Sequence, residues 1–167
     1  LFPYTFSHCS NLKTVTISNE SKLIEIDECC FSGDVSLVSI NLPTSIECIS
    51  SDAFLFTPSL ITIMSASNDN YQVLDKNEVY VKNDKTTSSL LFVPRNLTTY
   101  SIKENCSTIC SSAFSASQIT TVDFPITLET INEGAFAHSH LTKVVFPKSI
   151  QIIKDDAFLH CENLEAV

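Results

Sequence analysis

The chain has 167 residues, 44% of them hydrophobic and only 17% charged, which predicts one domain with a substantial buried core. Its formal net charge is −9, with 19 acidic residues against ten Lys and Arg, so nucleic acid is excluded as a partner. The apolar runs are only a few residues long, and we therefore expect no membrane insertion within the chain.

A phenylalanine recurs along the chain at a nearly constant spacing. The successive intervals are 25, 23, 38, 22, 22 and 22 residues, so one repeat carries extra residues. The repeated phenylalanines are Phe6, Phe31, Phe54, Phe92, Phe114, Phe136 and Phe158. Such a period predicts stacked units that bury a continuous core only together.

Between the phenylalanines the chain follows the frame L-x-x-V-x-[IF]-P-x-x-[IL]-x-x-I-x-x-x-A-F. The alternation in V-x-[IF] predicts a short strand with one buried face, and the following proline, as at Pro43, Pro125 and Pro147, ends it. The A-F segment predicts a short helical or 3₁₀ turn. We expect a β-rich solenoid, with short parallel strands on its concave face and turns and loops on its convex side.

The extra residues of the long repeat lie at about 68–89. Tyr71, Val73, Val79 and Val81 alternate there, and 75–77 is a plausible turn, so a hairpin-like insertion is expected. The insertion is interpreted either as a structural variant or as a functional excursion. Residues 1–167 are thus expected to form a single repeat domain of about seven units of 22–25 residues. Because the chain begins and ends inside repeat units, we expect a fragment of a longer protein.

The frame resembles the BspA-like leucine-rich repeats, also called the Treponema pallidum type. The family ending A-F-x-x-C is matched at 157–161 and, with Thr for Ala, at 5–9. The usual family glycine after the second Ile is replaced by Asp27, Ser50, Cys110, Asn132 and Lys154, which leaves the geometry of those turns open. The composition, poor in Gly, resembles members from parasitic protists such as trichomonad surface antigens.

This resemblance implies a leucine-rich-repeat solenoid in a cell-surface or secreted protein that adheres to host cells or matrix, with no catalytic residues to transfer. Outward-facing strand residues form the predicted binding face. One column is Thr14, Ser39, Thr62, Thr99, Thr121 and Lys143, and beside it lie Thr16, Asn41, Met64, Ser101, Asp123 and Val145. These residues either simply suit exposed strands or bind an extended peptide or glycan through many weak hydrogen bonds.

The other chemistry-bearing residues do not predict a reactive site. Cys9 and Cys161 share a frame position but lie about six repeats apart, too far for a disulfide, and no C-x-x-C pair occurs. The seven cysteines are interpreted as buried small hydrophobes. His138 and His160 belong to adjacent repeats and could stack. We expect no enzyme, metal site or cofactor, because no nucleophile motif or ligand spacing is present.

The sequence is compatible with three functions. The first is a non-catalytic adhesion module that contacts a host or matrix protein or a glycan through the concave face. The second is a structural spacer in a surface protein, and the third is an intracellular interaction scaffold. Three sequons, at Asn19, Asn96 and Asn105, match the number expected by chance and do not bear on secretion.

Overall fold

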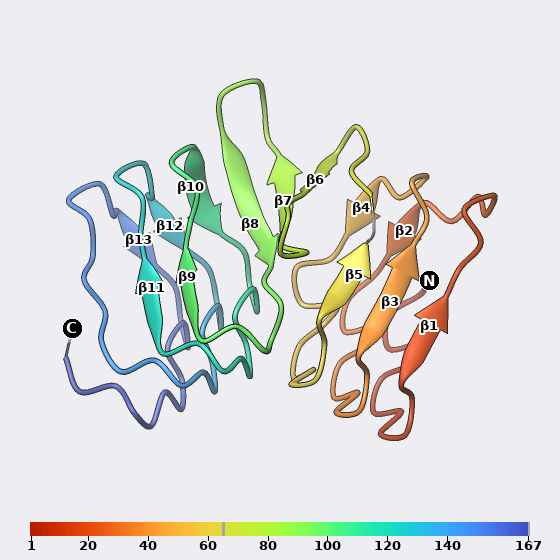
Figure 1. The fold of residues 1–167 in the computed structure, drawn as a ribbon, viewed down its shortest axis with the longest axis horizontal. Helices are drawn as coiled ribbons and strands as arrows, with labels where there is room; N and C mark the ends of the chain where they lie inside the picture. Colours follow the sequence, from red (N-terminus) through yellow and green to blue (C-terminus); the bar gives the residue numbers. More distant parts are fainter. Residues whose placement is uncertain (65, 167) are drawn as a thin grey trace.

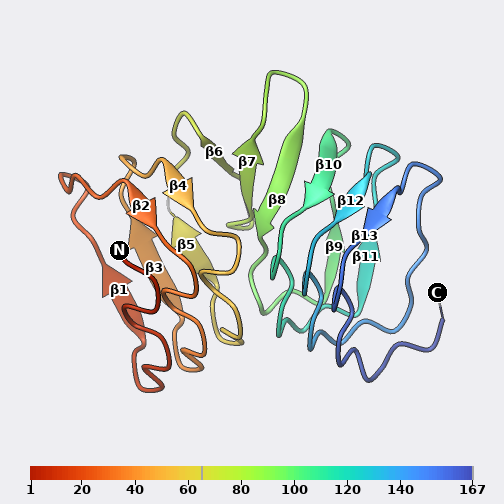
Figure 2. The same cartoon turned by 180° about the vertical axis from the view of Figure 1, so that it is seen from behind.

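The computed structural model describes residues 1–64 and 66–166, and it is a β-solenoid whose coils each contribute short strands to two rows. Figure 1 shows the row with β1, β3 and β11 in front of the row with β2, β12 and β13, and Figure 2 shows the reverse. Parallel pairing within each row is the stacking that the repeat period predicts.

The first strand row comes from the V-x-[IF] segments, as predicted. It consists of β1 (Thr14–Thr16), β3 (Ser39–Leu42), β5 (Thr62–Met64), β9 (Thr99–Ser101) and β11 (Thr121–Asp123). In register, Val15 lies beside Ile40 and Tyr100 beside Val122, and these side chains point into the core. The flanking residues point outward because side chains alternate along a strand.

The second strand row lies where the sequence predicts only turns and loops, so this part of the prediction is wrong. It contains β2 (Glu25–Ile26), β4 (Cys48–Ile49), β10 (Cys106–Ile109), β12 (Thr130–Ile131) and β13 (Ile152–Ile153). The strands pair in parallel, with Ile26 beside Ile49 and Ile109 beside Ile131. The fifth apolar position of the frame therefore also lies on a strand. Its residues in four repeats enter the core from this side, namely Ile26, Ile49, Ile109 and Ile131.

The segments around the repeated phenylalanines are chains of hydrogen-bonded turns, and we call each of them a Phe turn. No α- or 3₁₀-helix occurs in the described part of the chain, contrary to the helical turns expected. The reason lies in the backbone donors. The Phe31 N–H donates to the Ala53 carbonyl at 2.9 Å, and the Phe114 N–H donates to the Ala135 carbonyl at 2.8 Å. A donor committed to the next coil is not available for a helix within its own coil.

Each Phe turn is shaped by residues in the left-handed conformation. The residues two places before the phenylalanine are Tyr4, Cys29, Ser112, Gly134 and Asp156, and those two places after it are His8, Gly33, Phe56, Ala116, His138 and His160. The positions where the family glycine is replaced do not have positive φ, so that replacement carries no backbone strain. Glycine is used at Gly33, where an added Cβ would lie 2.4 Å from the His8 ring.

The repeated phenylalanines form two ladders of stacked rings in the core. In the N-terminal half Phe6, Phe31 and Phe54 stack with centroids 5.4 and 5.7 Å apart. In the C-terminal half Phe114, Phe136 and Phe158 stack at 4.5 and 5.1 Å. Phe92 of the long repeat meets Phe54 edge-on at 6.4 Å, so the stacking geometry changes at this repeat.

The insertion contains an antiparallel meander that joins the two halves. Its strands are β6 (Tyr71–Val73), β7 (Val79–Lys82) and β8 (Ser88–Phe92), and β8 also pairs in parallel with β10. On the N-terminal side of the meander, β6 does not pair with β4 within the described residues, and side-chain hydrogen bonds connect the two instead. The Asn68 amide donates to the Ile46 carbonyl at 2.7 Å, and the Tyr71 hydroxyl accepts the Ile49 N–H at 2.7 Å.

The position three residues after each phenylalanine forms a column of polar side chains and cysteines at the ends of the Phe turns. Its members are Cys9, Asp34, Thr57, Arg95, Ser117, Ser139 and Cys161, and the five between the terminal cysteines are buried. Asp34 accepts the Cys9 N–H through Oδ1 at 2.7 Å, and its Oδ2 has no partner among the described residues. Burial raises the pKa of this carboxyl to about 6.

We expect Phe136→Ala to lower the free energy of unfolding by about 3–5 kcal/mol, because the ring is fully buried between two stacked neighbours. Urea denaturation followed by circular dichroism measures this loss. Phe2→Ala is the matched control, since the Phe2 side chain is 85% exposed. Equal effects of the two substitutions would contradict the ring ladder as the source of stability.

Asp34 also predicts a pH dependence of stability. Its pKa is raised on folding, so the native protein binds more protons than the unfolded chain at pH values between about 4 and 6. Stability is therefore penalised above pH 6, and the penalty is relieved as the pH falls through this window. Asp34→Asn should stabilise the protein at pH 7 by about 1–3 kcal/mol and flatten the profile of urea midpoints. Asp75→Asn removes the same charge at an exposed position and is the matched control.

Candidate functional site

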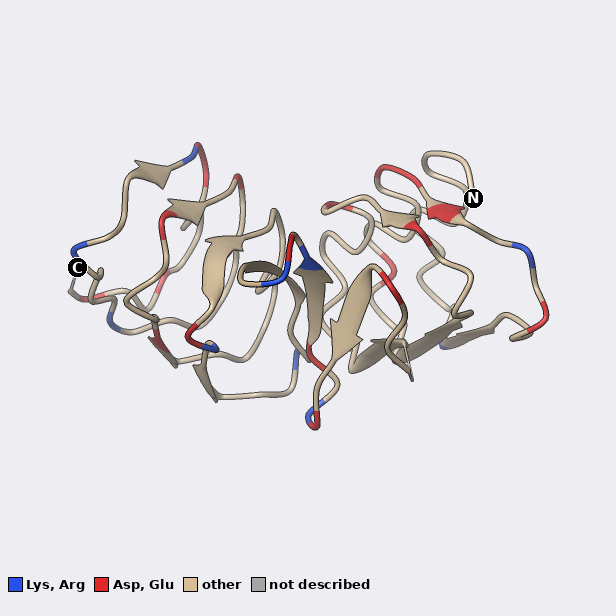
Figure 3. Ribbon diagram, turned by 90° about the horizontal axis from the view of Figure 1, so that it is seen from above, with Lys and Arg blue, Asp and Glu red and all other residues tan. Residues whose placement is uncertain are grey.

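The predicted binding residues mostly lie on the surface of the first strand row. Eight of them are exposed, namely Thr14, Thr16, Thr99, Ser101, Thr121, Asp123, Lys143 and Val145. Ser39, Asn41 and Thr62 are half-buried. The face is polar and carries few charges, and Figure 3 shows that most charged residues lie on connecting loops instead.

The register brings these residues into two separate groups instead of one continuous face. In the N-terminal half Thr14 lies beside Ser39 and Ser39 beside Thr62. In the C-terminal half Thr99 lies beside Thr121, and the Ser101 hydroxyl donates to Asp123 at 2.8 Å. The sheet β1-β3-β5 and the sheet β9-β11 are not hydrogen-bonded to one another within the described residues, because the meander intervenes in the chain.

Met64 and the last repeat depart from the predicted columns. A bulge between β3 and β5 pairs Met64 with the core residue Leu42, and the Met64 side chain is fully buried. Met64 is therefore part of the core, and its predicted place on the surface is wrong. Lys143 forms an isolated bridge with Ala166, and Val145 lies outside the strands.

A second surface feature, which the sequence analysis missed, is a cleft where the two halves of the solenoid meet. The cleft has a volume of about 460 Å³ and is bounded by the Phe turns of the second, third, fifth, sixth and seventh repeats. It exists because the long repeat reaches Phe92 through the strand β8 and has no Phe turn of its own. The available signal was the irregular interval of 38 residues between Phe54 and Phe92.

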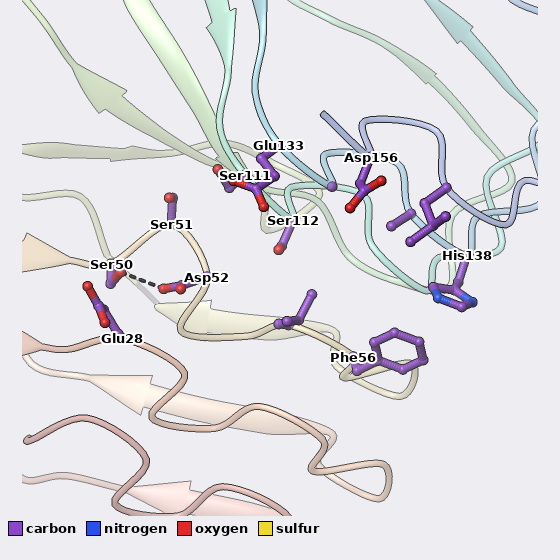
Figure 4. Close-up of a pocket in the computed structure, with 14 residues that line it drawn as sticks. Glu28, Ser50, Ser51, Asp52, Phe56, Ser111, Ser112, Glu133, His138 and Asp156 are labelled. Atoms are coloured by element: carbon purple, nitrogen blue, oxygen red, sulfur yellow. Dashed lines mark hydrogen bonds between the residues drawn. The ribbon is translucent and has the colours of Figure 1, made fainter. Parts of the chain in front are cut away.

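Carboxylates line the cleft from both sides, as Figure 4 shows. Glu28 and Asp52 belong to the N-terminal half, and Glu133 and Asp156 to the C-terminal half. Asp52 accepts a hydrogen bond from the Ser50 hydroxyl at 2.6 Å. At one end Phe56 meets His138 edge-on, with ring centroids 4.3 Å apart, so the two halves touch there.

Arg95 lies in the core at the junction between the halves. Its guanidinium donates to the Ala113 carbonyl at 2.6 Å and to the Ser112 carbonyl at 3.0 Å, and it lies over the Phe92 ring. Burial lowers the pKa of this group to about 9. Elsewhere, the N–H groups of one Phe turn donate to the carbonyls of the next. The long repeat has no Phe turn, so the Arg95 side chain supplies part of the missing donors to the carbonyls of the fifth Phe turn.

The cysteines and histidines are distributed over several environments. Cys30 and Cys106 are buried as expected, whereas Cys9 and Cys48 are exposed, so the interpretation of all seven as core residues is wrong. His138 and His160 do contact one another, with ring centroids 4.7 Å apart. Within residues 1–64 and 66–166, no three His, Cys, Asp or Glu side chains form a group able to hold a metal ion.

No helix in the described part of the chain is long and apolar enough to cross a membrane. The comparisons with known proteins agree with the repeat architecture. A family model described as the BspA type leucine rich repeat region matches in six copies, over residues 2–83 and 77–165. No curated protein matches the chain.

Solved structures with a similar fold come from bacteria. A leucine rich cell surface protein from Faecalibacterium prausnitzii A2-165 superposes with a TM-score of 0.69 at 24% identity, covering 98% of this chain and 55% of that one. The pneumococcal vaccine antigen PcpA gives 0.65 at 22% identity, covering 83% and 40%. A leucine-rich repeat protein from Eubacterium ventriosum gives 0.58 at 20%, covering 99% and 56%. The chain thus spans about half the length of these proteins.

We expect Arg95→Ser, which introduces the residue found at this frame position in two other repeats, to destabilise the protein by about 2–4 kcal/mol. Serine is too short to reach the Ser112 and Ala113 carbonyls, which then lose the guanidinium donors. Chemical denaturation measures the loss. Ser117→Ala serves as control, because the buried Ser117 hydroxyl has no partner among the described residues and its removal should be nearly neutral. A neutral Arg95→Ser would show that the junction does not need these bonds.

Proposed function

The chain belongs to the BspA-type leucine-rich-repeat family, and we propose that it is a non-catalytic binding module of a cell-surface or secreted protein. In this proposal the first strand row contacts a host protein, a matrix protein or a glycan. The comparison with the Faecalibacterium prausnitzii cell surface protein supports the location. At identities below 25% the solved structures establish the fold, so the location and the partner belong to the proposal.

The observation that carries the proposal is the arrangement of exposed hydroxyl groups on the first strand row. Thr14 and Thr16 point outward from β1, and Thr99 and Thr121 point outward from the neighbouring strands β9 and β11. Neighbouring strands lie about 4.8 Å apart, so the hydroxyls form a regular polar array. An extended peptide or glycan could make many weak hydrogen bonds along such an array, each contributing about 0.5–1.5 kcal/mol.

The same structure also favours a spacer role, which is the second candidate. Hydrogen bonds between successive coils and the stacked phenylalanines give a self-supporting rod in which each coil contacts its neighbours. A spacer would hold another part of the protein away from the cell. It would not require particular side chains on the exposed face of the first strand row. The two functions differ in whether the exposed hydroxyls contribute to binding.

The test is binding of the purified chain to host-type cells, immobilised matrix proteins and immobilised glycans. The variant Thr14→Glu, Thr99→Glu, Thr121→Glu places carboxylates on both parts of the face and should weaken saturable binding by at least about 10-fold, which is about 1.4 kcal/mol. Exposure of all three side chains means that folding should be retained, which circular dichroism and the urea midpoint would verify.

A matched control adds the same charge elsewhere on the surface. The variant Thr44→Glu, Gln118→Glu, Gln151→Glu changes three exposed residues outside the first strand row. It should change binding by less than about 2-fold, or about 0.4 kcal/mol. Equal weakening by both variants would assign binding to overall charge, and the absence of binding by the unmodified chain would favour the spacer.

A further inference from the structure

The cleft between the two halves of the solenoid combines charge, an apolar wall and an unpartnered polar group. From these features we infer that it binds an arginine or lysine side chain from a basic segment of a partner protein. This second site is independent of the hydroxyl array on the first strand row. It lies on the Phe turns, which are a different part of the coils from the first strand row.

The charge of the cleft selects for a cation. Glu28, Asp52, Glu133 and Asp156 supply four carboxylates, and none of them forms an ion pair with a basic side chain in the described part of the chain. His138 lines one end of the cleft, and Arg95 is buried behind the wall, where it donates to the Ser112 carbonyl. The carboxylates therefore exceed the positive charge, and a guanidinium or ammonium group from outside would be attracted.

The apolar part of the lining suits the aliphatic stem that carries such a cation. Leu55, Phe56, Ala137 and Leu159 line the cleft, and the Phe56 side chain is 39% exposed. Long basic side chains bury their methylene groups against apolar surface while the charged end makes polar contacts. The exposed face of an aromatic ring near the carboxylates adds a cation–π contact to the same ligand.

Ser112 provides an observation that does not depend on the acidic residues. The residue is 5% exposed and lines the cleft, and its hydroxyl has no hydrogen-bond partner among the described residues. Figure 4 shows this hydroxyl pointing into the cleft. A hydroxyl oxygen accepts hydrogen bonds, so a donor that enters the cleft would find an available acceptor there. Guanidinium and ammonium groups are donors and not acceptors, which fits the surrounding carboxylates.

The size of the cleft and the charge of the chain limit the possible occupants. A volume of about 460 Å³ falls in the range of small-molecule pockets and accommodates one or two side chains. A second copy of this chain is disfavoured, because each copy carries a formal charge of −9. A basic segment of a different protein has both the charge and the reach that the cleft requires.

The experiment measures binding of a fluorescein-labelled peptide Ala-Arg-Ser-Arg-Ala to the whole chain by fluorescence anisotropy. Binding should be saturable, and a peptide with glutamine in place of both arginines should bind at least about 10-fold more weakly. The variant Glu133→Gln, Asp156→Asn removes two carboxylates from the cleft and should weaken binding of the arginine peptide by at least about 10-fold. Asparagine tolerates the left-handed conformation at position 156, where φ is 56°, so the fold should be kept.

The matched control is Glu20→Gln, Glu104→Gln, which removes the same charge from exposed positions outside the cleft. It should change affinity by less than about 2-fold, because exposed charges at a distance are screened by salt. Phe56→Ala should weaken binding of the peptide without changing the net charge. This variant separates contact in the cleft from attraction to the acidic protein as a whole.

Three results would overturn the inference. They are the absence of saturable binding of the arginine peptide, equal binding of the glutamine peptide, and equal weakening by the cleft and control variants. A separate competition experiment adds spermidine to the complex of the chain and the arginine peptide. If spermidine binds to the cleft as tightly as the peptide does, the ligand is a free polyamine and the assignment to a protein segment is wrong.

Discussion

The backbone hydrogen bond between successive Phe turns is the interaction on which the rest of the structure depends. Each turn donates N–H groups to the carbonyls of the following turn, as Phe136 does to Ala157 at 2.8 Å. A coil of about 22 residues cannot satisfy these groups or bury its phenylalanine alone. Stacking therefore decides the fold: it keeps the turns from becoming helices, aligns the aromatic rings and places the strands in two parallel rows.

Within the described residues, the stacking is interrupted only at the long repeat, and the distinctive features of the molecule follow from this interruption. Its phenylalanine, Phe92, is reached through β8 and not through a turn, so a layer is absent between the third and fifth Phe turns. Arg95 supplies donors to the Ser112 and Ala113 carbonyls. The Asn68 and Tyr71 side chains cap the edge of β4. The structure remains continuous, but a cleft opens between its halves.

The sequence pattern predicted the outward direction of most binding-face residues correctly, but it did not predict the features that depend on how the coils pack. Alternation in V-x-[IF] correctly assigned outward positions such as Thr14 and Thr121, because side-chain direction along a strand depends on backbone geometry alone. Met64 was misplaced, because a bulge beside the meander shifts its register by one residue and turns it into the core. The cleft combines residues as far apart as Glu28 and Leu159, and their proximity depends on how the two halves meet.

The sequence by itself determined the period, the core columns, the first strand row and the family, since these are repeated in every unit and each repetition reinforces the pattern. The tertiary structure alone decided the second strand row, the hydrogen-bonded turns in place of helices, the division of the polar face and the cleft. These features depend on which coil each backbone donor reaches, and a single repeat contains no information about its neighbour's position. The interruption at Phe92 is visible in the sequence as an irregular spacing, but its consequence, a cleft lined by carboxylates from both halves, arises only when the coils are stacked.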